Sequence, residues 1–182
     1  IPYILIDNFP DLGLIVSLRF LEWVIENPEG VISLPTGKTP EYFIKWTHYL
    51  LKNWGNPRVE HIIRKHGFST KDKPDLSKLT FVQIDEFYPL NPDQHNSFSN
   101  YVTKYYLDGF NIPHDNALLI NANNITLFEG EHWSKIFPGG IINLSLRHQD
   151  PTNHLEEKQQ ESLFLIDQWC NEYEKKIREI GG

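Results

Sequence analysis

Methionine is absent from the 182 residues of this chain, which begins at Ile1. A chain without methionine cannot begin at its own initiator, so we expect a processed, trimmed or partial product. Cysteine is nearly absent too, since Cys170 is the only one. One cysteine excludes a disulfide within the chain and a cysteine-based metal cluster, and it favours a reducing, cytoplasmic location.

A long apolar run and an excess of basic residues are also missing. No uninterrupted apolar stretch approaches the roughly 18 residues of a membrane span, and no signal-peptide pattern opens the chain. The 17 Lys and Arg residues face 24 Asp and Glu residues, which gives a net charge of −7. This balance argues against nucleic acid or a membrane as partner, but not against a small anion, which one helix terminus and one lysine can capture.

The residues that are present predict a folded protein. With 40% hydrophobic and 23% charged residues, the chain is long and apolar enough for one domain with a core. Its 8 histidines form no i, i+4 pair with a carboxylate partner, so we interpret them as solvated or loop residues. We expect neither a metal nor a cofactor.

Hydrophobic periodicity predicts alternating strands and helices. Helical patterns cover residues 11–26, 40–54, 59–65, 97–110 and 151–180. Short apolar runs predict strands at residues 3–6, 31–34, 79–84, 117–120 and 141–144. Such alternation is typical of an α/β fold, here a Rossmann-like open parallel sheet with helices on both faces.

Two helical faces give specific expectations. The helix that Ser97 is expected to cap has a predicted buried face of Phe98, Tyr101, Val102 and Tyr105. The predicted face of the last helix holds Leu163, Ile166, Cys170, Tyr173, Ile177 and Ile180. We therefore interpret Cys170 as a small core residue rather than a nucleophile.

Residues 55–78 and 121–155 interrupt the alternation. The first range is rich in glycine, proline and charge, which predicts a surface excursion, and the second carries Pro138-Gly139-Gly140 and a polar stretch. We interpret both as insertions in a single α/β domain that spans residues 1–182.

The stretch Leu34-Pro35-Thr36-Gly37-Lys38-Thr39-Pro40 joins a predicted strand to a predicted helix. Free backbone N–H groups and the positive end of the helix dipole converge at such a turn, where a phosphate can bind. Gly37 permits close backbone approach, Lys38 supplies a charge and Thr39 a hydroxyl. A plain Pro/Gly turn with an exposed lysine would account for the same residues.

Asp85 and Glu86 follow the predicted strand at residues 79–84. Parallel sheets place ligands at the carboxyl ends of their strands, where this pair and the Gly37 turn both lie. The pair could be a general base with a charge partner, or merely acidic loop residues. A phosphate cradle that faces a carboxylate suits proton transfer on a phosphorylated small molecule.

A P-loop ATPase is an alternative from another class, because Gly-Lys-Thr and Asp-Glu each follow a strand. Its first motif needs a glycine five residues before Gly37, where this chain has Ile32. Gly30 lies two residues too early, so the loop is too short to encircle a triphosphate.

Leu34-Pro-Thr-Gly-Lys-Thr-Pro and Phe81-Val-Gln-Ile-Asp-Glu-Phe resemble the glucosamine-6-phosphate deaminase (isomerase) family. In that family an L-P-T-G-G-T-P-like loop and an M-D-E-Y-like segment occur in this order. Asn111-Ile112-Pro113 with Asp115 and Asn116, and Tyr173-Glu174-Lys175-Lys176-Ile177, resemble two later family segments. The resemblance covers most of the chain outside residues 55–78 and 121–155.

This resemblance implies a cytoplasmic enzyme of amino-sugar catabolism that converts glucosamine 6-phosphate and water to fructose 6-phosphate and ammonia. It implies that Thr36, Gly37, Lys38 and Thr39 bind the sugar phosphate, through backbone N–H groups and the Thr39 hydroxyl. Asp85 would be the base that moves a proton from C2 to C1, with Glu86 in support. Homo-oligomerisation is left open.

Two departures from the family pattern matter. Lys38 stands where the family has a second glycine, and the family's ring-opening G-x-D-G-H segment does not occur before Gly182. The chain therefore corresponds to the N-terminal portion of the family's domain, and we expect it to be inactive alone. Two further hypotheses stay open: a 6-phosphogluconolactonase, whose D-E-R pattern has Phe87 at the arginine position, and a non-catalytic sugar-phosphate sensor.

Overall fold

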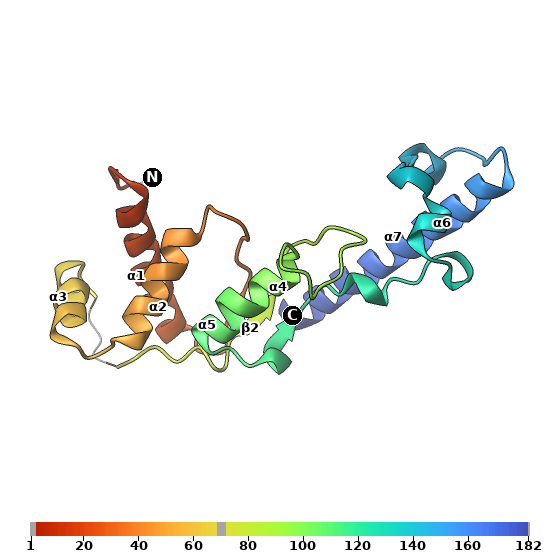
Figure 1. The fold of residues 1–182 in the computed structure, drawn as a ribbon. Coiled ribbons are helices and arrows are strands. Elements are labelled where there is room, and N and C mark those ends of the chain that lie inside the picture. Colours follow the sequence, from red (N-terminus) through yellow and green to blue (C-terminus); the bar gives the residue numbers. More distant parts are fainter. Residues whose placement is uncertain (1–2, 69–71, 182) are drawn as a thin grey trace. The chain divides into compact units, whose positions relative to one another are not determined.

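The computed structural model describes residues 3–68 and 72–181 of the chain, which divides into two compact units (Figure 1). Unit 1 consists of Ile1–Asp85 and His95–Ile120, and unit 2 of Glu86–Gln94 and Asn121–Gly182. The interpretation of residues 1–182 as one domain with two insertions stays a prediction. Residues 1–2, 69–71 and 182, which fall within that range, lie outside the described residues.

Unit 1 is built on a parallel sheet. Its helices are α1 (Phe9–Glu26), α2 (Glu41–Lys52), α3 (Pro57–Lys65), α4 (Phe98–Val102) and α5 (Asp108–Phe110), and its strands are β1 (Val31–Ile32), β2 (Thr80–Val82) and β3 (Ala117–Leu118). The strands lie in the order β1-β2-β3, with Ile32 opposite Phe81 and Val82 opposite Leu118. The predicted α/β class with an open parallel sheet is confirmed, although the strands are shorter than the apolar runs that predicted them.

The crossing of α1 and α2 fixes where α2 begins. A Cβ atom built on Gly13 would lie 2.5 Å from the Cβ of Tyr42, so the helices approach this closely because α1 has glycine here. The buried Ser17 hydroxyl donates to the carbonyl oxygen of Phe43 at 2.9 Å. These contacts hold the first turn of α2, and with it the loop that enters α2.

The segment around α3 belongs to the core of unit 1 in part. Val59, Ile63, Phe68 and Leu76 are buried and pack in the same cluster as residues of α1, α2 and β2. The expectation that residues 55–78 form a surface excursion is therefore wrong for these positions. Val59 and Ile63 lie one helical turn apart, so both face the core, while Glu60 and His61 between them are exposed.

Two predicted strands are absent from the part of the chain that the structure describes. Residues 3–6 have no regular structure, and residues 141–144 form irregular chain that enters a 3-10 turn, Leu144–Arg147. Leu5 is 84% exposed and Ile141 is 75% exposed. A short apolar run becomes a strand only where a neighbouring strand satisfies its backbone N–H and C=O groups, and neither run has one.

The helix after Ser97 departs from α-helical periodicity. Ser97 caps α4 as predicted, since its hydroxyl accepts the N–H of Asn100 at 3.2 Å. A π turn, Thr103–Leu107, then joins α4 to α5. Tyr106 is fully buried whereas Tyr105 is 36% exposed, so the predicted buried face is wrong at Tyr105. The wider π turn rotates the following residues relative to an α-helix.

Unit 2 is made of short turns and helices that pack on one long helix. It contains α6 (Trp133–Ile136), α7 (His154–Gly181) and 3-10 turns at Ala122–Asn124, Phe128–Gly130, Pro138–Gly140 and Leu144–Arg147. Its core holds Leu127, Ile136, Phe137, Leu146 and Leu163. The guanidinium of Arg147 donates to both carboxylate oxygens of Asp167, each at 2.7 Å, and ties the last 3-10 turn to α7.

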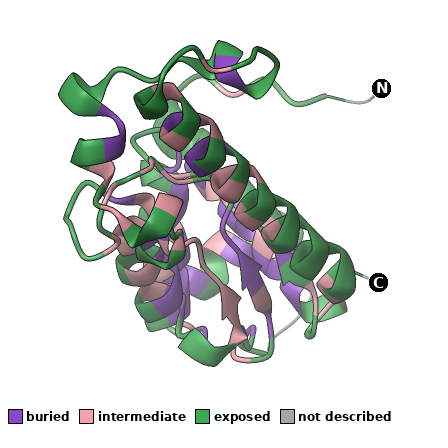
Figure 2. Cartoon of the chain, turned by 90° about the vertical axis from the view of Figure 1, so that its right-hand side faces the viewer, coloured by how far each residue is buried: buried purple, intermediate pink, exposed green. Residues whose placement is uncertain are grey.

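The second half of α7 is largely exposed, as the helix that leads to the C label shows in Figure 2. The long helix predicted at residues 151–180 is confirmed, but its predicted apolar face is not buried throughout. Cys170 is exposed, so its interpretation as a core residue is wrong. The core of unit 2 covers Leu163 but does not extend along the helix to Cys170.

Candidate functional site

The loop between β1 and α2 leaves the carboxyl end of β1 and turns at Gly37. The Ser33 hydroxyl donates to the carbonyl oxygen of Val82 at 2.7 Å, which ties the start of the loop to β2. Gly37 has φ +88°, and a Cβ atom built on it would meet open space. Glycine is therefore needed here for its backbone conformation and not for lack of room.

Two tyrosines of the helix that runs through α4 and α5 hold the carbonyl groups of this loop. The Tyr101 hydroxyl donates to the carbonyl oxygen of Gly37 at 2.7 Å. The Tyr106 hydroxyl donates to the carbonyl oxygen of Pro35. At the next residue, the carbonyl oxygen of Lys38 accepts the N–H of Glu41 at 3.2 Å. The oxygen atoms at these three positions are thus all engaged by the protein.

The N–H groups of the same loop are free. Within residues 3–68 and 72–181, the backbone nitrogens of Thr36, Gly37, Lys38 and Thr39 donate no hydrogen bond. All of these residues except Thr36 are exposed. The α2 N-terminus that follows has Pro40 at its cap position and no side-chain cap. A row of free N–H groups beside the positive end of a helix dipole is an anion-binding arrangement.

Asp85 lies at the same edge of the sheet as the loop, because β1 and β2 are parallel neighbours. The buried side chain of Gln83 fixes the backbone there. Its Nε2 donates to the carbonyl oxygen of Asp85 at 2.8 Å, and its Oε1 accepts the N–H of Ile120 at 3.0 Å. The Asp85 residue itself is exposed, so its carboxylate is accessible to a ligand.

The sequence-predicted site residues divide between the two units. Thr36, Gly37, Lys38, Thr39 and Asp85 all lie in unit 1, at the carboxyl ends of β1 and β2. Glu86 is the first residue of unit 2, and its carboxylate accepts the N–H of Phe87 at 2.9 Å. The structure therefore groups the first five residues at one sheet edge and leaves the role of Glu86 a prediction.

The charges around the loop entrance are mixed. Lys45 bonds to the Glu41 carboxylate one helical turn away, and this hydrogen bond is the main cause that lowers the pKa of Glu41. The Lys38 charge adds a smaller lowering of the same pKa. Lys38 is exposed and makes no ion pair with any described residue. Its ammonium group can therefore turn to an anion on the loop.

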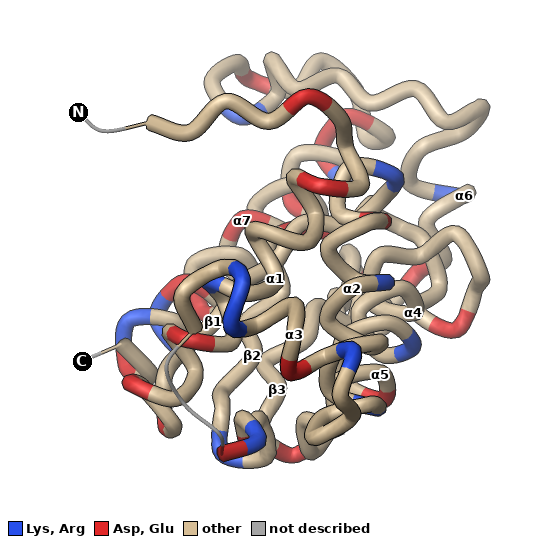
Figure 3. The backbone as a smooth tube through the Cα atoms, turned by 90° about the vertical axis from the view of Figure 1, so that its left-hand side faces the viewer, with Lys and Arg blue, Asp and Glu red and all other residues tan. Residues whose placement is uncertain are grey.

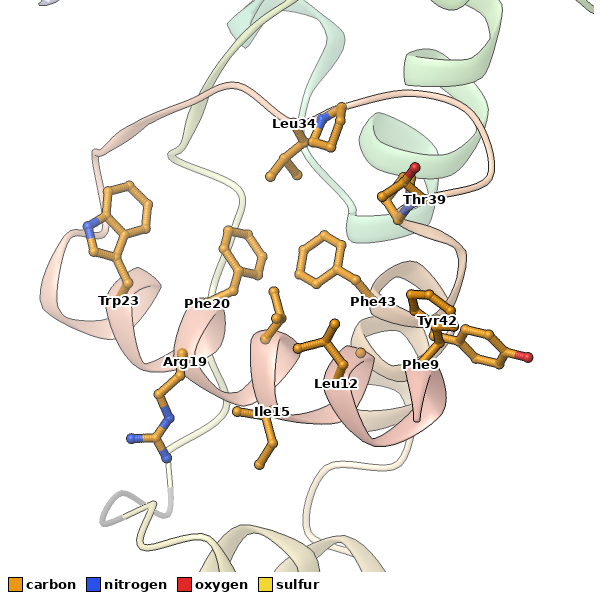
Figure 4. A pocket seen from close by; sticks show the side chains of 14 residues that line it. Phe9, Leu12, Ile15, Arg19, Phe20, Trp23, Leu34, Thr39, Tyr42 and Phe43 are labelled. Atoms are coloured by element: carbon orange, nitrogen blue, oxygen red, sulfur yellow. The ribbon is translucent and has the colours of Figure 1, made fainter. Parts of the chain in front are cut away.

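An apolar cavity of about 590 Å³ adjoins the loop, and its walls come from α1, the loop and the start of α2 (Figure 4). It shares Pro35 and Thr39 with the loop, and Phe20, Trp23 and Phe43 contribute aromatic walls. Its charged residue, Arg19, is engaged with the Glu22 carboxylate at 2.8 Å and with the carbonyl oxygen of His66 at 2.9 Å. Most of the cavity lining is apolar, and its Thr39 belongs to the loop as well, so the N–H row remains the candidate site for a phosphate.

Metal ligands are not gathered near this edge. Across the described ranges, no group of three or more His, Cys, Asp or Glu side chains is placed to hold a metal ion. Figure 3 shows acidic and basic positions interspersed along the chain. A search of the described residues also found no helix with the length and apolarity to cross a membrane.

Sequence reasoning missed three residues that shape the site. The sequence places Gln83 in a predicted strand and Tyr101 on a predicted buried helical face, and it predicts no role in the site for either. Tyr106 was absent from the predicted buried face, because a spacing of five from Tyr101 does not fit an α-helix. The available signal was the polar Gln83 near the end of the mostly apolar run at residues 79–84, whereas the π turn left none.

In sequence, the chain is similar to glucosamine-6-phosphate deaminases. No protein-family model matches the chain. A glucosamine-6-phosphate deaminase of Clostridium botulinum (strain Loch Maree / Type A3) is 27% identical over 145 residues, which are 79% of this chain and 52% of that protein. One of Clostridium tetani (strain Massachusetts / E88) is 25% identical over 142 residues, 77% of this chain and 52% of that protein.

A solved structure shares the fold. It is that of a monomeric glucosamine-6-phosphate deaminase of the NagB superfamily, with a TM-score of 0.50 and 19% identity, over 65% of this chain and 42% of that one. The chain spans about half the length of the curated relatives it matches. The predicted family resemblance is confirmed: the chain is similar in sequence to glucosamine-6-phosphate deaminases over 79% of its length.

Proposed function

We propose that this chain provides the phosphate-binding and proton-transferring half of an enzyme that converts glucosamine 6-phosphate and water to fructose 6-phosphate and ammonia. The observation that carries the proposal is the row of free N–H groups at residues 36–39, beside the strand end that bears Asp85. The relatives' names support deamination of glucosamine 6-phosphate, and the resemblance of the motifs implies the products.

The loop anchors the substrate in this proposal. The N–H groups of Gly37, Lys38 and Thr39 bind the phosphate oxygens, together with the Thr39 hydroxyl, and Thr36 adds a further N–H. Charge-assisted hydrogen bonds of this kind contribute about 1.5–3 kcal/mol each before the cost of ordering the ligand. Lys38 supplies a side-chain charge where the family has glycine.

Asp85 acts on carbon. Its carboxylate takes the proton from C2 of the open-chain sugar and returns it to C1, through an enolamine intermediate. Water then adds to the resulting imine carbon at C2, which releases ammonia and leaves the ketose. The phosphate anchor holds C2 against the carboxylate throughout, so the transfer is intramolecular within the complex. Glu86 supports the site in a role that remains open.

A non-catalytic sugar-phosphate sensor is the second candidate. Its support is the row of free N–H groups at residues 36–39, which can bind an anion whether or not a reaction follows. No described feature favours the lactonase or the ATPase. Ile32, which stands where the ATPase loop needs glycine, lies buried in β1.

Ammonia release from glucosamine 6-phosphate tests the proposal, with the protein encoded by the whole gene. Asp85→Asn should abolish turnover and change the affinity for the substrate less than threefold, because the amide keeps the size of the side chain. Gly37→Ala should weaken substrate binding. Substrate binding by the wild-type protein without ammonia release would establish the sensor, and normal turnover by Asp85→Asn would contradict the assignment of the base.

A further inference from the structure

The two tyrosine hydroxyls contact the loop at alternate peptide groups. Tyr106 bonds to the carbonyl oxygen of Pro35, and Tyr101 to that of Gly37. The peptide bonds that follow Pro35 and Gly37 are trans, since the cis bond found among the described residues is Tyr88-Pro89. In a trans peptide the N–H points opposite to the C=O. The N–H groups of Thr36 and Lys38 therefore point away from the tyrosines.

The π turn brings these tyrosines to one face of their helix. In an α-helix, residues five apart lie about 140° apart around the axis, so they cannot contact the same short loop. The π turn Thr103–Leu107 follows Tyr101 and contains Tyr106. Its i, i+5 hydrogen bond, from the Asp108 N–H to the Thr103 carbonyl oxygen, widens the helix, so residues five apart lie closer together around the axis than in an α-helix. The rings of Tyr101 and Tyr106 lie 6.0 Å apart between centroids.

Packing holds both rings in place. The Tyr106 ring stacks on Phe81 of β2 at 5.6 Å and contacts Phe110 at 5.5 Å. The Tyr101 ring contacts that of Tyr105 at 4.6 Å. Burial raises the pKa of Tyr106 and of Tyr101, so both hydroxyls stay protonated and remain donors at neutral pH.

We propose that Tyr101 and Tyr106 are positioning residues, which orient two peptide groups of the loop so that the Thr36 and Lys38 N–H groups face a phosphate monoester. This inference rests on the proposed function of the loop and goes beyond it, because it names what pre-organises the site. A loop whose N–H groups already point outward loses less entropy when it binds an anion. A carbonyl turned toward the phosphate would repel it instead.

The test uses Tyr101→Phe and Tyr106→Phe, which keep the rings and remove the hydroxyl groups. Tyr105→Phe is the matched control, since Tyr105 lies on the same π turn and its hydroxyl bonds to no described atom. The full chain, labelled with nitrogen-15, is titrated with inorganic phosphate, and the loop amide signals report both affinity and order. Nitrogen-15 relaxation gives the backbone order of Thr36 and Lys38 without phosphate.

The expected result is a three- to tenfold loss of phosphate affinity in Tyr101→Phe and in Tyr106→Phe, with lower backbone order at Thr36 and Lys38. Tyr105→Phe should match the wild type in both measurements. If both Phe variants bind phosphate as the wild type does and show the same loop order, the positioning role is wrong while the proposed function stands. If the wild type itself binds no phosphate, the proposed function and this inference both fail.

Discussion

The loop after β1 and the loop after β2 begin at the same edge of the sheet but are built differently. The first has its carbonyl oxygens bound by Tyr101, Tyr106 and the N–H of Glu41, and its N–H groups are free. The second is held at its backbone by Gln83 and leaves the Asp85 carboxylate exposed. Under the proposed function, the phosphate-binding part of the site is preformed within unit 1, whereas the chemical part is one accessible carboxylate.

This difference suggests that anion binding and turnover are separable in this chain. Under the proposed function, binding depends on the backbone geometry that the helix through α4 and α5 imposes. Turnover depends instead on the Asp85 carboxylate. The following substitutions test the difference between the two loops, in order of decreasing expected effect.

Tyr106→Ala should have the largest effect, because it empties a fully buried position and frees the loop carbonyl of Pro35. Loss of a large buried aromatic side chain costs about 3–5 kcal/mol of unfolding free energy. Tyr105→Ala, one residue away and 36% exposed, should cost about 1 kcal/mol or less. Urea unfolding of both variants checks the π turn, and equal losses would argue for a regular α-helix.

Gly37→Ala should strain the loop, because φ +88° disfavours any residue with a Cβ atom. We expect a loss of about 1–3 kcal/mol in unfolding free energy and at least a fivefold loss of phosphate affinity. Gly55→Ala is the matched control, with φ +83° and equally open space. It should lose similar stability in urea but bind phosphate normally. A Gly55→Ala protein that also lost binding would assign the effect to general destabilisation.

Lys38→Ala should weaken phosphate binding about threefold at low salt, and less at 0.5 M salt, because an exposed charge is screened. Lys52→Ala removes the same charge from the last turn of α2, at the end opposite the loop. Isothermal titration with phosphate at two salt concentrations compares them. Equal losses in the two variants would mean that net charge, rather than the position of Lys38, sets the affinity.

Glu41→Gln should have the smallest effect, a rise of about twofold in phosphate affinity at neutral pH, because it removes a negative charge from the entrance of α2. The pKa of Glu41 is lowered chiefly by its bond to Lys45. A lowered folded-state pKa stabilises the protein above the unfolded value of 4.5, and this contribution disappears as the pH falls through the folded value. Urea unfolding from pH 3 to 7 should therefore show wild type and Glu41→Gln converging in acid. A difference that persists there would contradict the assignment.

Much of unit 1 could be predicted because its signals are local. Apolar runs marked β1, β2 and β3, and helical spacing marked α1, α2 and α3. The Leu34–Pro40 stretch could be placed at a strand end from glycine, proline and the preceding apolar run. Two runs, residues 3–6 and 141–144, carried the same local signal and formed no strand, since a strand depends on a partner that periodicity does not reveal.

The tyrosine contacts could not be predicted. They join residues 64 and 71 positions apart in sequence, and they depend on a π turn that α-helical spacing conceals. Gln83 was visible as a polar residue in an apolar strand, but its two partners, the backbone of Asp85 and of Ile120, required the register of β2 and β3. Motifs therefore located the site, and long-range packing determined how it is oriented.

Phosphate titration of the nitrogen-15-labelled wild-type chain tests the central claim most directly. The account predicts saturable shifts of the Thr36, Gly37 and Lys38 amide signals, and the same shifts in Asp85→Asn, whose loop is intact. Shifts that do not saturate, or that centre on residues away from the loop, would contradict it.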